Sequence, residues 1–581
     1  MKAILINSLN TVNFIKEKKE IYKNHLICTV YSSIFWECKK NSIECIDLNS
    51  LITNEDIKNE HDTSIDFYTT FLHTLDHKSK ELLNISSDLP KMDWFFSLFR
   101  YAPLIDYISL NLLKKILFRL IEKFKIDHFT LLGLVNTNSS FLKSEDYNNF
   151  IEKCFEEKSI KVEYIIDKKI IQKKYSLKFS DFKEFIKDRI LTFRNFIFYI
   201  NVLFLKKENN VIFLDDVNDN DKKFYCNENT LTLKTKVRKL NPNIPSIKID
   251  ELENLLNQDE NSNYILDLFK KKFCYHLKMN HRRYVEQIFQ LWKIITKYKI
   301  KKVYWALPPN IPNIKAVMVD FLIKKNINVL GLQHGGTYGL FEDNDYSADK
   351  LHALSDYFFC STFFSYGNIK LNNKLNSFSK YKLCKFKKIG SQNIKNFIKK
   401  NNVENYDLTK KVVFPVNITS SIIRTKLVMA SAERCSLIKN IFEILKKDLN
   451  NVIVKLYPNI SNSFIEQLYP VKIILNQYNK FKICELDFLS SIKKHKPGLI
   501  VIEEISTPLY DSIPFNCEII CFTEPLTRIK SDLRIKLEKR IHFVKDIKEF
   551  KEKYNLFLNN KLSRKRDKHF LNVEIINNEI S

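Results

Sequence analysis

A histidine stands among glycines in the stretch GLQHGGTYGLFED, residues 331–343 of a 581-residue chain. Only 8 glycines occur in the whole sequence, and four of them lie between positions 331 and 339. Histidine titrates near neutral pH, so His334 is a candidate general base for the proton of an attacking hydroxyl. Because glycine has no Cβ, Gly335 and Gly336 would let a substrate approach closely. The stretch therefore predicts a catalytic loop.

Acidic residues follow this histidine at once. Glu342 or Asp345 could orient the imidazole of His334, or could itself act as the base, and a solvated loop is the alternative for each carboxylate. We count His334, Glu342 and Asp345 as the candidate catalytic residues. The candidate residues for contacting the acceptor or shaping the loop are Gln333, Gly335, Gly336, Thr337 and Tyr338.

A second stretch, EEISTPLYD at 503–511, follows the apolar run GLIVIE. Ser506 or Thr507 suits the N-cap of a helix, and Pro508 suits its first turn. The free N–H groups of such a helix start attract phosphate, and the two hydroxyls add donors. We expect a diphosphate or nucleotide cradle here, with Glu503 among the donor-binding residues. A capped helix without a ligand is the alternative.

Two further runs place polar residues after apolar segments that are typical of strands. Lys455 and Tyr457 follow VIVK, and Ser420 and Arg424 lie between VVFPV and a long helical pattern. A lysine or arginine at such a position could neutralise phosphate and assist departure of a nucleotide. Simple surface exposure is the alternative for each residue taken singly, and their joint placement at strand ends is the stronger evidence for donor binding.

Strands and helices alternate along most of the chain, which predicts an α/β fold. KKVYWAL, a helical pattern and INVLGL form a β-α-β unit that ends just before QHGG. From 385 to 560, KFKKIG, KKVVFPV, NVIVKLY, GLIVIE and CEIICF alternate with helical patterns. We predict a GT-B-like architecture, two Rossmann-like doubly wound domains facing a cleft, with helical insertions in the N-terminal half. The expected boundaries are an acceptor domain at 1–375, a nucleotide-donor domain at 376–560 and a polar tail at 561–581.

The composition excludes several classes of protein. The 12 cysteines form no CxxC pair and no Cys/His cluster at zinc spacing, so we expect no metal site. GxxxxGK[ST] and an early GxGxxG are absent, which disfavours P-loop ATPases and NAD dehydrogenases. The apolar run at 195–205 is too short to cross a bilayer. We therefore expect a cytoplasmic protein without a cofactor.

The formal net charge of +27 is spread along the chain, as in a solvated lysine surface. It also suits anionic partners such as a phosphorylated substrate or an anionic membrane. We expect peripheral contact with the inner face of a membrane, where lipid-linked acceptors lie, and no nucleic-acid partner, since no recognised binding motif is present.

Five stretches in the second half resemble, in the same order, the bacterial transferases of surface carbohydrate biosynthesis, relatives of capsule polysaccharide enzymes and, more remotely, of teichoic-acid glycerophosphotransferases. These stretches are LGLQHGGTYG, LSDYFFCSTFFSYG, KKIGS, VKLYPN and EEISTPLYDSIPFNCEIICF. The resemblance covers roughly residues 300–525 and implies a GT-B fold, a nucleotide-activated donor and no obligatory metal. It implies His334 as the acceptor-side base and donor-binding positions at Lys455, Ser506 and Thr507. KLYP departs from the His-Pro or Arg-rich forms of these families, which leaves the donor nucleotide open.

We therefore predict a metal-independent glycosyltransferase that moves a sugar from a nucleotide-sugar donor to a saccharide or lipid-linked acceptor of a growing surface polysaccharide or lipopolysaccharide. One alternative is a polyol-phosphate transferase with a CDP-glycerol type of donor, in which the same base would deprotonate an acceptor hydroxyl that attacks phosphorus in place of an anomeric carbon. Another is a non-enzymatic basic scaffold that binds membranes or nucleic acid and would not depend on His334.

Overall fold

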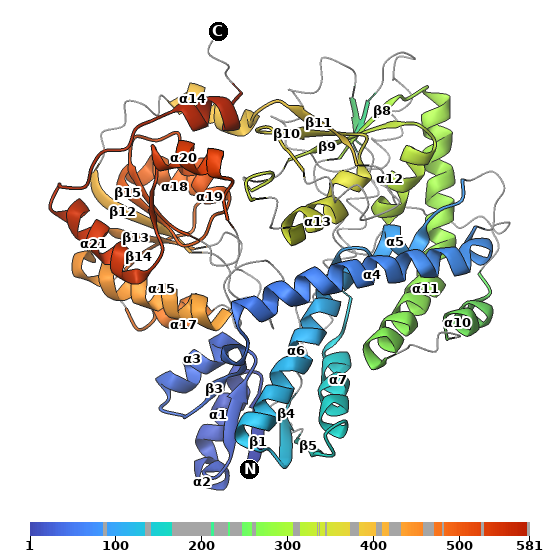
Figure 1. Cartoon of the computed structure of the whole chain (residues 1–581), viewed down its shortest axis with the longest axis horizontal. Helices are drawn as coiled ribbons and strands as arrows, with labels where there is room; N and C mark the ends of the chain where they lie inside the picture. Colours follow the sequence, from blue (N-terminus) through green and yellow to red (C-terminus); the bar gives the residue numbers. More distant parts are fainter. Residues whose placement is uncertain are drawn as a thin grey trace, which may run out of the picture.

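A computed structural model shows three parallel β-sheets and a layer of long helices (Figure 1). It describes residues 1–84, 90–133, 141–165, 211–213, 230–232, 247–257, 263–305, 314–333, 335, 337–342, 346–371, 383–401, 409–416, 431–456, 470–478, 481–523 and 528–577.

The N-terminal sheet has five strands in the order β3-β2-β1-β4-β5. Its central strand β1 is apolar and buried, as expected for a strand covered on both faces. The strands are β1 (Lys2–Ile6), β2 (Leu26–Thr29), β3 (Ile46–Asp47), β4 (His128–Leu132) and β5 (Lys161–Ile165). The helices of this part are α1 (Leu9–Glu17), α2 (Lys19–Tyr22), α3 (Ser32–Lys40), the 3-10 helix η1 (Leu48–Leu51) and α7 (Ser144–Glu156).

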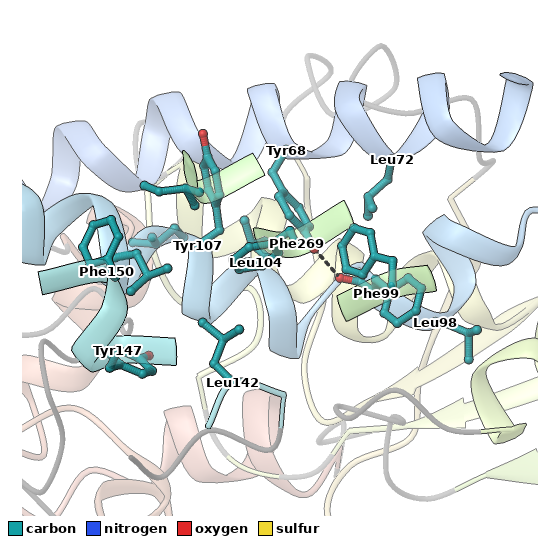
Figure 2. Packing of buried hydrophobic residues seen from close by; sticks show 14 of the residues in the cluster. Tyr68, Leu72, Leu98, Phe99, Leu104, Tyr107, Leu142, Tyr147, Phe150 and Phe269 are labelled. Carbon is teal, nitrogen blue, oxygen red and sulfur yellow. Dashed lines mark hydrogen bonds between the residues drawn. The ribbon is translucent and has the colours of Figure 1, made fainter. Parts of the chain in front are cut away.

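Long helices join this sheet to the rest of the molecule, and aromatic side chains fill the space between them (Figure 2). The Phe99 and Phe273 rings stack with centroids 4.1 Å apart, and the Tyr68 hydroxyl donates to the Phe99 carbonyl at 3.1 Å. The helices are α4 (Asn54–Leu83), α5 (Trp94–Phe99), α6 (Ala102–Phe124), α10 (Ile249–Asn257) and α11 (Tyr264–Lys297). α4 crosses the centre of the molecule between the N-terminal and middle sheets.

The middle sheet has six strands in the order β11-β10-β9-β8-β6-β7. It includes Lys385–Lys388, which we had grouped with the C-terminal strands; this assignment was wrong, because β11 pairs in parallel with Thr362–Ser365. The strands are β6 (Val211–Phe213), β7 (Thr230–Thr232), β8 (Lys302–Trp305), β9 (Asn328–Leu332), β10 (Thr362–Ser365) and β11 (Lys385–Lys388). The helices are α12 (Ile314–Lys324), α13 (Tyr346–Ser355) and the 3-10 helix η2 (Tyr357–Phe359).

The C-terminal sheet has six strands in the order β14-β13-β12-β15-β16-β17. The strands are β12 (Thr409–Pro415), β13 (Val452–Lys455), β14 (Lys482–Cys484), β15 (Pro497–Ile502), β16 (Glu518–Phe522) and β17 (His542–Val544). The helices are α14 (Gln392–Asn401), α15 (Ser431–Leu445), η5 (Lys446–Asp448), α17 (Pro470–Leu475), α18 (Phe488–His495), α19 (Thr507–Ser512), α20 (Ser531–Glu538), α21 (Ile547–Leu558) and the π-helix η6 (Leu571–Ile575).

Helices of the N-terminal part also pack against helices of the C-terminal part. Trp36 on α3 is buried in the same hydrophobic cluster as the core of the C-terminal sheet. Asn54 at the start of α4 donates to Glu433 on α15 at 3.0 Å. The α/β class with doubly wound parallel sheets is confirmed, and the GT-B-like arrangement of two domains stays a prediction. The predicted N-terminal domain, residues 1–375, contains the N-terminal sheet and most of the middle sheet, whose strand β11 lies beyond the predicted boundary.

The end of the chain differs from the polar tail expected at 561–581. Phe570, Leu571, Ile575 and Ile576 are buried, because their apolar side chains pack against the C-terminal sheet. The Ser391 amide donates to the Ile575 carbonyl at 2.6 Å, which ties this segment to the link between the two larger sheets. The described part of the tail is therefore a structural element.

Candidate functional site

The two stretches singled out in the sequence meet in space. Gly335 follows the carboxyl end of β9, and Thr507 opens α19 after the carboxyl end of β15. A Cβ on Gly335 would lie 2.9 Å from the Thr507 Oγ1. Ligands of open α/β sheets bind at such carboxyl edges, and here two of these edges are in contact. We call this contact, between Gln333, Gly335 and residues 337–342 on one side and the start of α19 on the other, the junction.

A short antiparallel pairing holds the other end of the loop. The Glu342 amide donates to the Arg528 carbonyl at 2.7 Å, and the Lys530 amide donates to the Leu340 carbonyl at 3.0 Å. Phe341 and Ile529 form the bridge between these bonds. The backbone of the loop is thus hydrogen-bonded to the C-terminal part, and the half-buried Glu342 is one of the residues that form these bonds.

Gln333 shapes the loop through both atoms of its buried amide. The Oε1 accepts from the Tyr366 amide at 2.8 Å, and the Nε2 donates to the Gly335 carbonyl at 2.7 Å. Gly335 has φ +113, a conformation that side chains with a Cβ rarely adopt. Of the two roles considered for Gln333, loop-shaping is the one that these contacts support.

Tyr338 anchors the loop in the core of the middle sheet. Its ring stacks on His352 with centroids 4.3 Å apart, and its hydroxyl donates to the Asp356 carboxylate at 3.0 Å. Burial, together with the charge of Asp356, raises the pKa of Tyr338 well above its usual value. The hydroxyl therefore stays protonated at neutral pH. The neighbouring Thr337 is half-buried, and its carbonyl accepts from the Leu340 amide at 3.3 Å.

The helix predicted after 503–506 is present as α19. Ser506 occupies its N-cap position and Pro508 its first turn, as expected. The Ser506 hydroxyl, however, donates to the Glu504 carbonyl at 3.3 Å and makes no side-chain cap. The exposed Thr507 side chain lies toward Gly335.

Glu503 takes part in a buried ion pair. Arg434 on α15 reaches the Glu503 carboxylate through its Nη2 at 3.2 Å, and its Nη1 pairs with Glu504. All three residues are buried. Buried carboxylates need a cationic partner to offset the cost of desolvation. Arg434, some 70 residues earlier in the sequence, is this partner. The adjacent glutamates at a strand end were the signal in the sequence that a buried cation was needed, and Arg434 was missed. The donor-binding role of Glu503 stays a prediction.

Lys455 is buried at the carboxyl end of β13. Its Nζ donates to the Leu456 carbonyl. Burial lowers the pKa of Lys455, while the neighbouring Cys484 and Asp487 act in the opposite direction. A buried lysine at this edge is suited to an anionic group, and its contact with the donor stays a prediction.

Asp511 is a titratable residue near the junction that the sequence reasoning did not single out. It stands four residues after Thr507 on α19, hence on the same face of the helix. Burial, and secondarily the charge of Asp487, raises the pKa of Asp511 to about 7. Among the described residues it has no hydrogen-bond or ion-pair partner. The signal was its place at the end of EEISTPLYD, one helical turn below the threonine.

Six of the predicted site residues lie outside the described residues, and their roles remain predictions: His334, Gly336, Asp345, Ser420, Arg424 and Tyr457. Within the described part, no group of three or more His, Cys, Asp or Glu side chains is placed to hold a metal ion. Among the described helices, none combines the length and apolar character needed to cross a membrane.

No protein-family model matches the sequence, and no curated protein matches it. Solved structures to which this chain shows similarity include UDP-GlcNAc 2-epimerase from Methanocaldococcus jannaschii in complex with UDP-GlcNAc and UDP, at 16% identity and a TM-score of 0.35, covering 62% of this chain and 93% of that one. HepE from Anabaena in complex with UDP-glucose has 9% identity and a TM-score of 0.31, covering 61% and 91%. MurG from Acinetobacter baumannii has 10% identity and a TM-score of 0.28, covering 61% and 92%.

Proposed function

We propose that the chain is a glycosyltransferase that moves a sugar from a nucleotide-activated donor to the acceptor of a growing surface polysaccharide or lipopolysaccharide. The observation that supports it is the contact between Gly335 and Thr507, which joins the histidine-bearing loop of one sheet to the start of α19 on another. A donor and an acceptor bound at these two edges would meet at the junction.

In this proposal the donor nucleotide binds at the edge of the C-terminal sheet. Lys455 and Arg424 neutralise its phosphates without a metal ion, and the Thr507 hydroxyl donates a hydrogen bond to them. Glu503, Ser420, Tyr457 and Ser506 complete the donor side.

In this proposal the acceptor hydroxyl binds beside the loop after β9. His334 removes its proton while the acceptor oxygen bonds to the anomeric carbon of the donor, and the bond from that carbon to the phosphate oxygen breaks. The nucleotide leaves with the electron pair of the broken bond. Glu342 or Asp345 either orients His334 or takes the proton in its place.

The site of action in this proposal is the cytoplasmic face of the inner membrane, reached by peripheral contact. The net charge of +27 favours anionic lipid there. Sedimentation with anionic vesicles at low and moderate salt tests this contact, and absence of binding at both salt concentrations would remove it.

The main test is an assay of the purified full chain with UDP-, CDP- and CMP-linked donors and a surface polysaccharide acceptor. We expect nucleotide release in the wild type, its loss in His334→Ala, and its retention in His569→Ala, which changes an exposed histidine at the other end of the chain. Equal activity of the two variants would eliminate His334 as the base. Release of CMP from CDP-glycerol would instead favour polyol-phosphate transfer.

A further inference from the structure

A groove of about 610 Å³ lies between α4 and α6, away from the junction. Its wall on α4 includes Glu60, Ser64 and Phe67, and its wall on α6 includes Tyr107 and Asn111. Nothing in the proposed transfer reaction uses these residues. The groove combines an exposed aromatic ring with a row of paired polar groups, and each of these features restricts what could bind.

The aromatic part is an open platform. Phe67 is 49% exposed, although it stacks on Tyr107 with ring centroids 6.0 Å apart and an interplanar angle of 15°. Tyr107 below it is only 6% exposed. One face of Phe67 is therefore supported by the protein while much of the ring remains in contact with water. The electron-rich face of such a ring attracts C–H groups, which a pyranose ring presents on its flat side.

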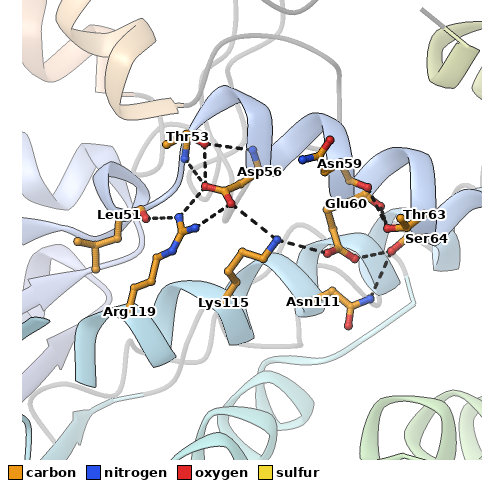
Figure 3. A network of polar contacts seen from close by, with 10 residues as sticks. All are labelled: Leu51, Thr53, Asp56, Asn59, Glu60, Thr63, Ser64, Asn111, Lys115 and Arg119. Atoms are coloured by element: carbon orange, nitrogen blue, oxygen red, sulfur yellow. Dashed lines mark hydrogen bonds and ion pairs between the residues drawn. The ribbon is translucent and has the colours of Figure 1, made fainter. Parts of the chain in front are cut away.

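The polar part offers donors and acceptors side by side (Figure 3). The Ser64 hydroxyl donates to the Glu60 carboxylate at 2.5 Å, and the Asn111 amide donates to the Ser64 Oγ at 3.4 Å. Lys115 lies 4.0 Å from Glu60. Carboxylate, amide, hydroxyl and ammonium groups in one row can both accept from and donate to the hydroxyls at the edge of a sugar.

The charges of the groove are balanced, in contrast to the rest of this basic chain. Lys114 pairs with Glu157 at 2.7 Å, and Arg119 pairs with Asp56 at 2.6 Å. Partial burial would raise the pKa of Asp56, but its hydrogen bonds to Arg119 and Thr53 outweigh this and hold the pKa well below its usual value. Since the cations already have carboxylate partners, the groove does not favour an anionic ligand over a neutral one.

The groove lies across α4 from α13, the helix that follows the loop of the junction. α13, the helix that follows this loop, and α6 lie on opposite sides of α4 (Figure 1). Lys350 on α13 forms an ion pair with Asp66, the neighbour of Phe67 on α4. About one helix diameter, roughly 10 Å, therefore separates α13 from the groove. A ligand long enough to pass around α4 would extend from one to the other.

We propose that the groove between α4 and α6 binds neutral sugar units of the acceptor chain, away from the end that receives the new sugar. This deepens the proposed function and rests on it for the identity of the chain as an acceptor. Phe67 supports the flat face of a pyranose ring, and Glu60, Ser64 and Asn111 bind its hydroxyls. Longer acceptors would consequently bind more tightly than short ones.

The test is affinity electrophoresis of the full chain in gels that contain dextran, glycogen, galactomannan, xylan or hydroxyethyl cellulose. We expect at least one of these neutral polysaccharides to retard the wild type, and Phe67→Ala to weaken that binding about tenfold. Phe67→Trp keeps an aromatic platform and should restore it. Tyr275→Ala, which removes a ring that is 63% exposed on α11, is the matched control and should bind as the wild type does. Equal thermal midpoints of Phe67→Ala and wild type establish that the fold is intact.

Two results would refute saccharide binding in the groove. One is no retardation by any of the five polysaccharides, and the other is equal retardation of Phe67→Ala and the wild type. Nucleotide release from sugar donors separates this outcome from failure of the proposed function. If donors are turned over and Phe67→Ala does not change polysaccharide binding, saccharide binding in the groove is refuted and the proposed transferase activity is supported. If polysaccharide binding depends on Phe67 and no donor is bound or turned over, the proposed transferase activity is refuted and saccharide binding in the groove is supported.

Discussion

Replacing Gly335 by alanine would perturb the junction in two separable ways. At φ +113 a residue with a Cβ is strained, and such strain costs on the order of 1–3 kcal/mol. The new Cβ would also lie 2.9 Å from the Thr507 Oγ1, so one of the two groups must move. Because Thr507 is exposed, its side chain can turn from its preferred rotamer, which costs about 1 kcal/mol. We expect Gly335→Ala to destabilise the junction by about 2–4 kcal/mol in all.

A double-mutant cycle distinguishes these two contributions. Thr507→Ala removes the Oγ1. In this background Gly335→Ala should destabilise the junction by about 1 kcal/mol less than in the wild type, because the steric contact is gone and only the backbone strain remains. Gly339→Ala is the matched control, because Gly339 also has a positive φ, +70, but its Cβ would meet Ile369. Thr507→Ala should therefore leave the effect of Gly339→Ala unchanged.

The assay is native-state hydrogen exchange of peptides that cover residues 328–342 and 503–513, which reports the free energy of local opening. Additive effects of Gly335→Ala and Thr507→Ala would show that the two residues are not in contact in solution. If Gly335→Ala left the opening free energy at its wild-type value, the left-handed conformation of Gly335 would be refuted as well.

Three further predictions concern the charged groups. The folded state holds a proton on Asp511, whose pKa is about 7, that the unfolded chain loses near pH 4. The contribution of Asp511 to stability is therefore fully present below pH 4 and decreases by up to about 4 kcal/mol as pH rises to 7, and Asp511→Asn should remove this component of the pH dependence in urea unfolding at pH 4–8. Arg434→Met leaves two buried carboxylates without their cation and should cost about 3–5 kcal/mol, seen as a lower thermal midpoint; a wild-type midpoint would contradict a structural role for this pair. Arg119→Gln removes a much more exposed pair and should cost less than about 1 kcal/mol in the same measurement, so a loss as large as that of Arg434→Met would be evidence against this ranking.

Part of the site could be predicted because local chemistry reveals it. The run GLIVIE followed by Ser506, Thr507 and Pro508 predicted a strand and the start of a helix, and both are present. INVLGL followed by QHGG likewise predicted a strand that ends at the loop. These predictions succeeded because apolar runs and helix-start residues act on their immediate neighbours.

Other features depend on partners that are distant in the sequence. KFKKIG has the pattern of a strand, but only its pairing with β10 decides which sheet it joins. Arg434 could not be recognised as the partner of Glu503 and Glu504, because α15 and the end of β15 meet only in the fold. The apolar residues near 570–576 were expected in a tail, and their burial depends on a surface formed by residues far earlier in the chain.

The sequence by itself determined the α/β class and the candidate loop and helix start, because periodicity, glycine and capping residues have short-range physical effects. The tertiary structure alone decided that the chain forms three sheets, that Gly335 meets Thr507, and that Asp511 is partly buried one turn below that threonine. Contacts and desolvation of this kind arise from the packing of segments that are distant in the sequence, and no local pattern encodes them.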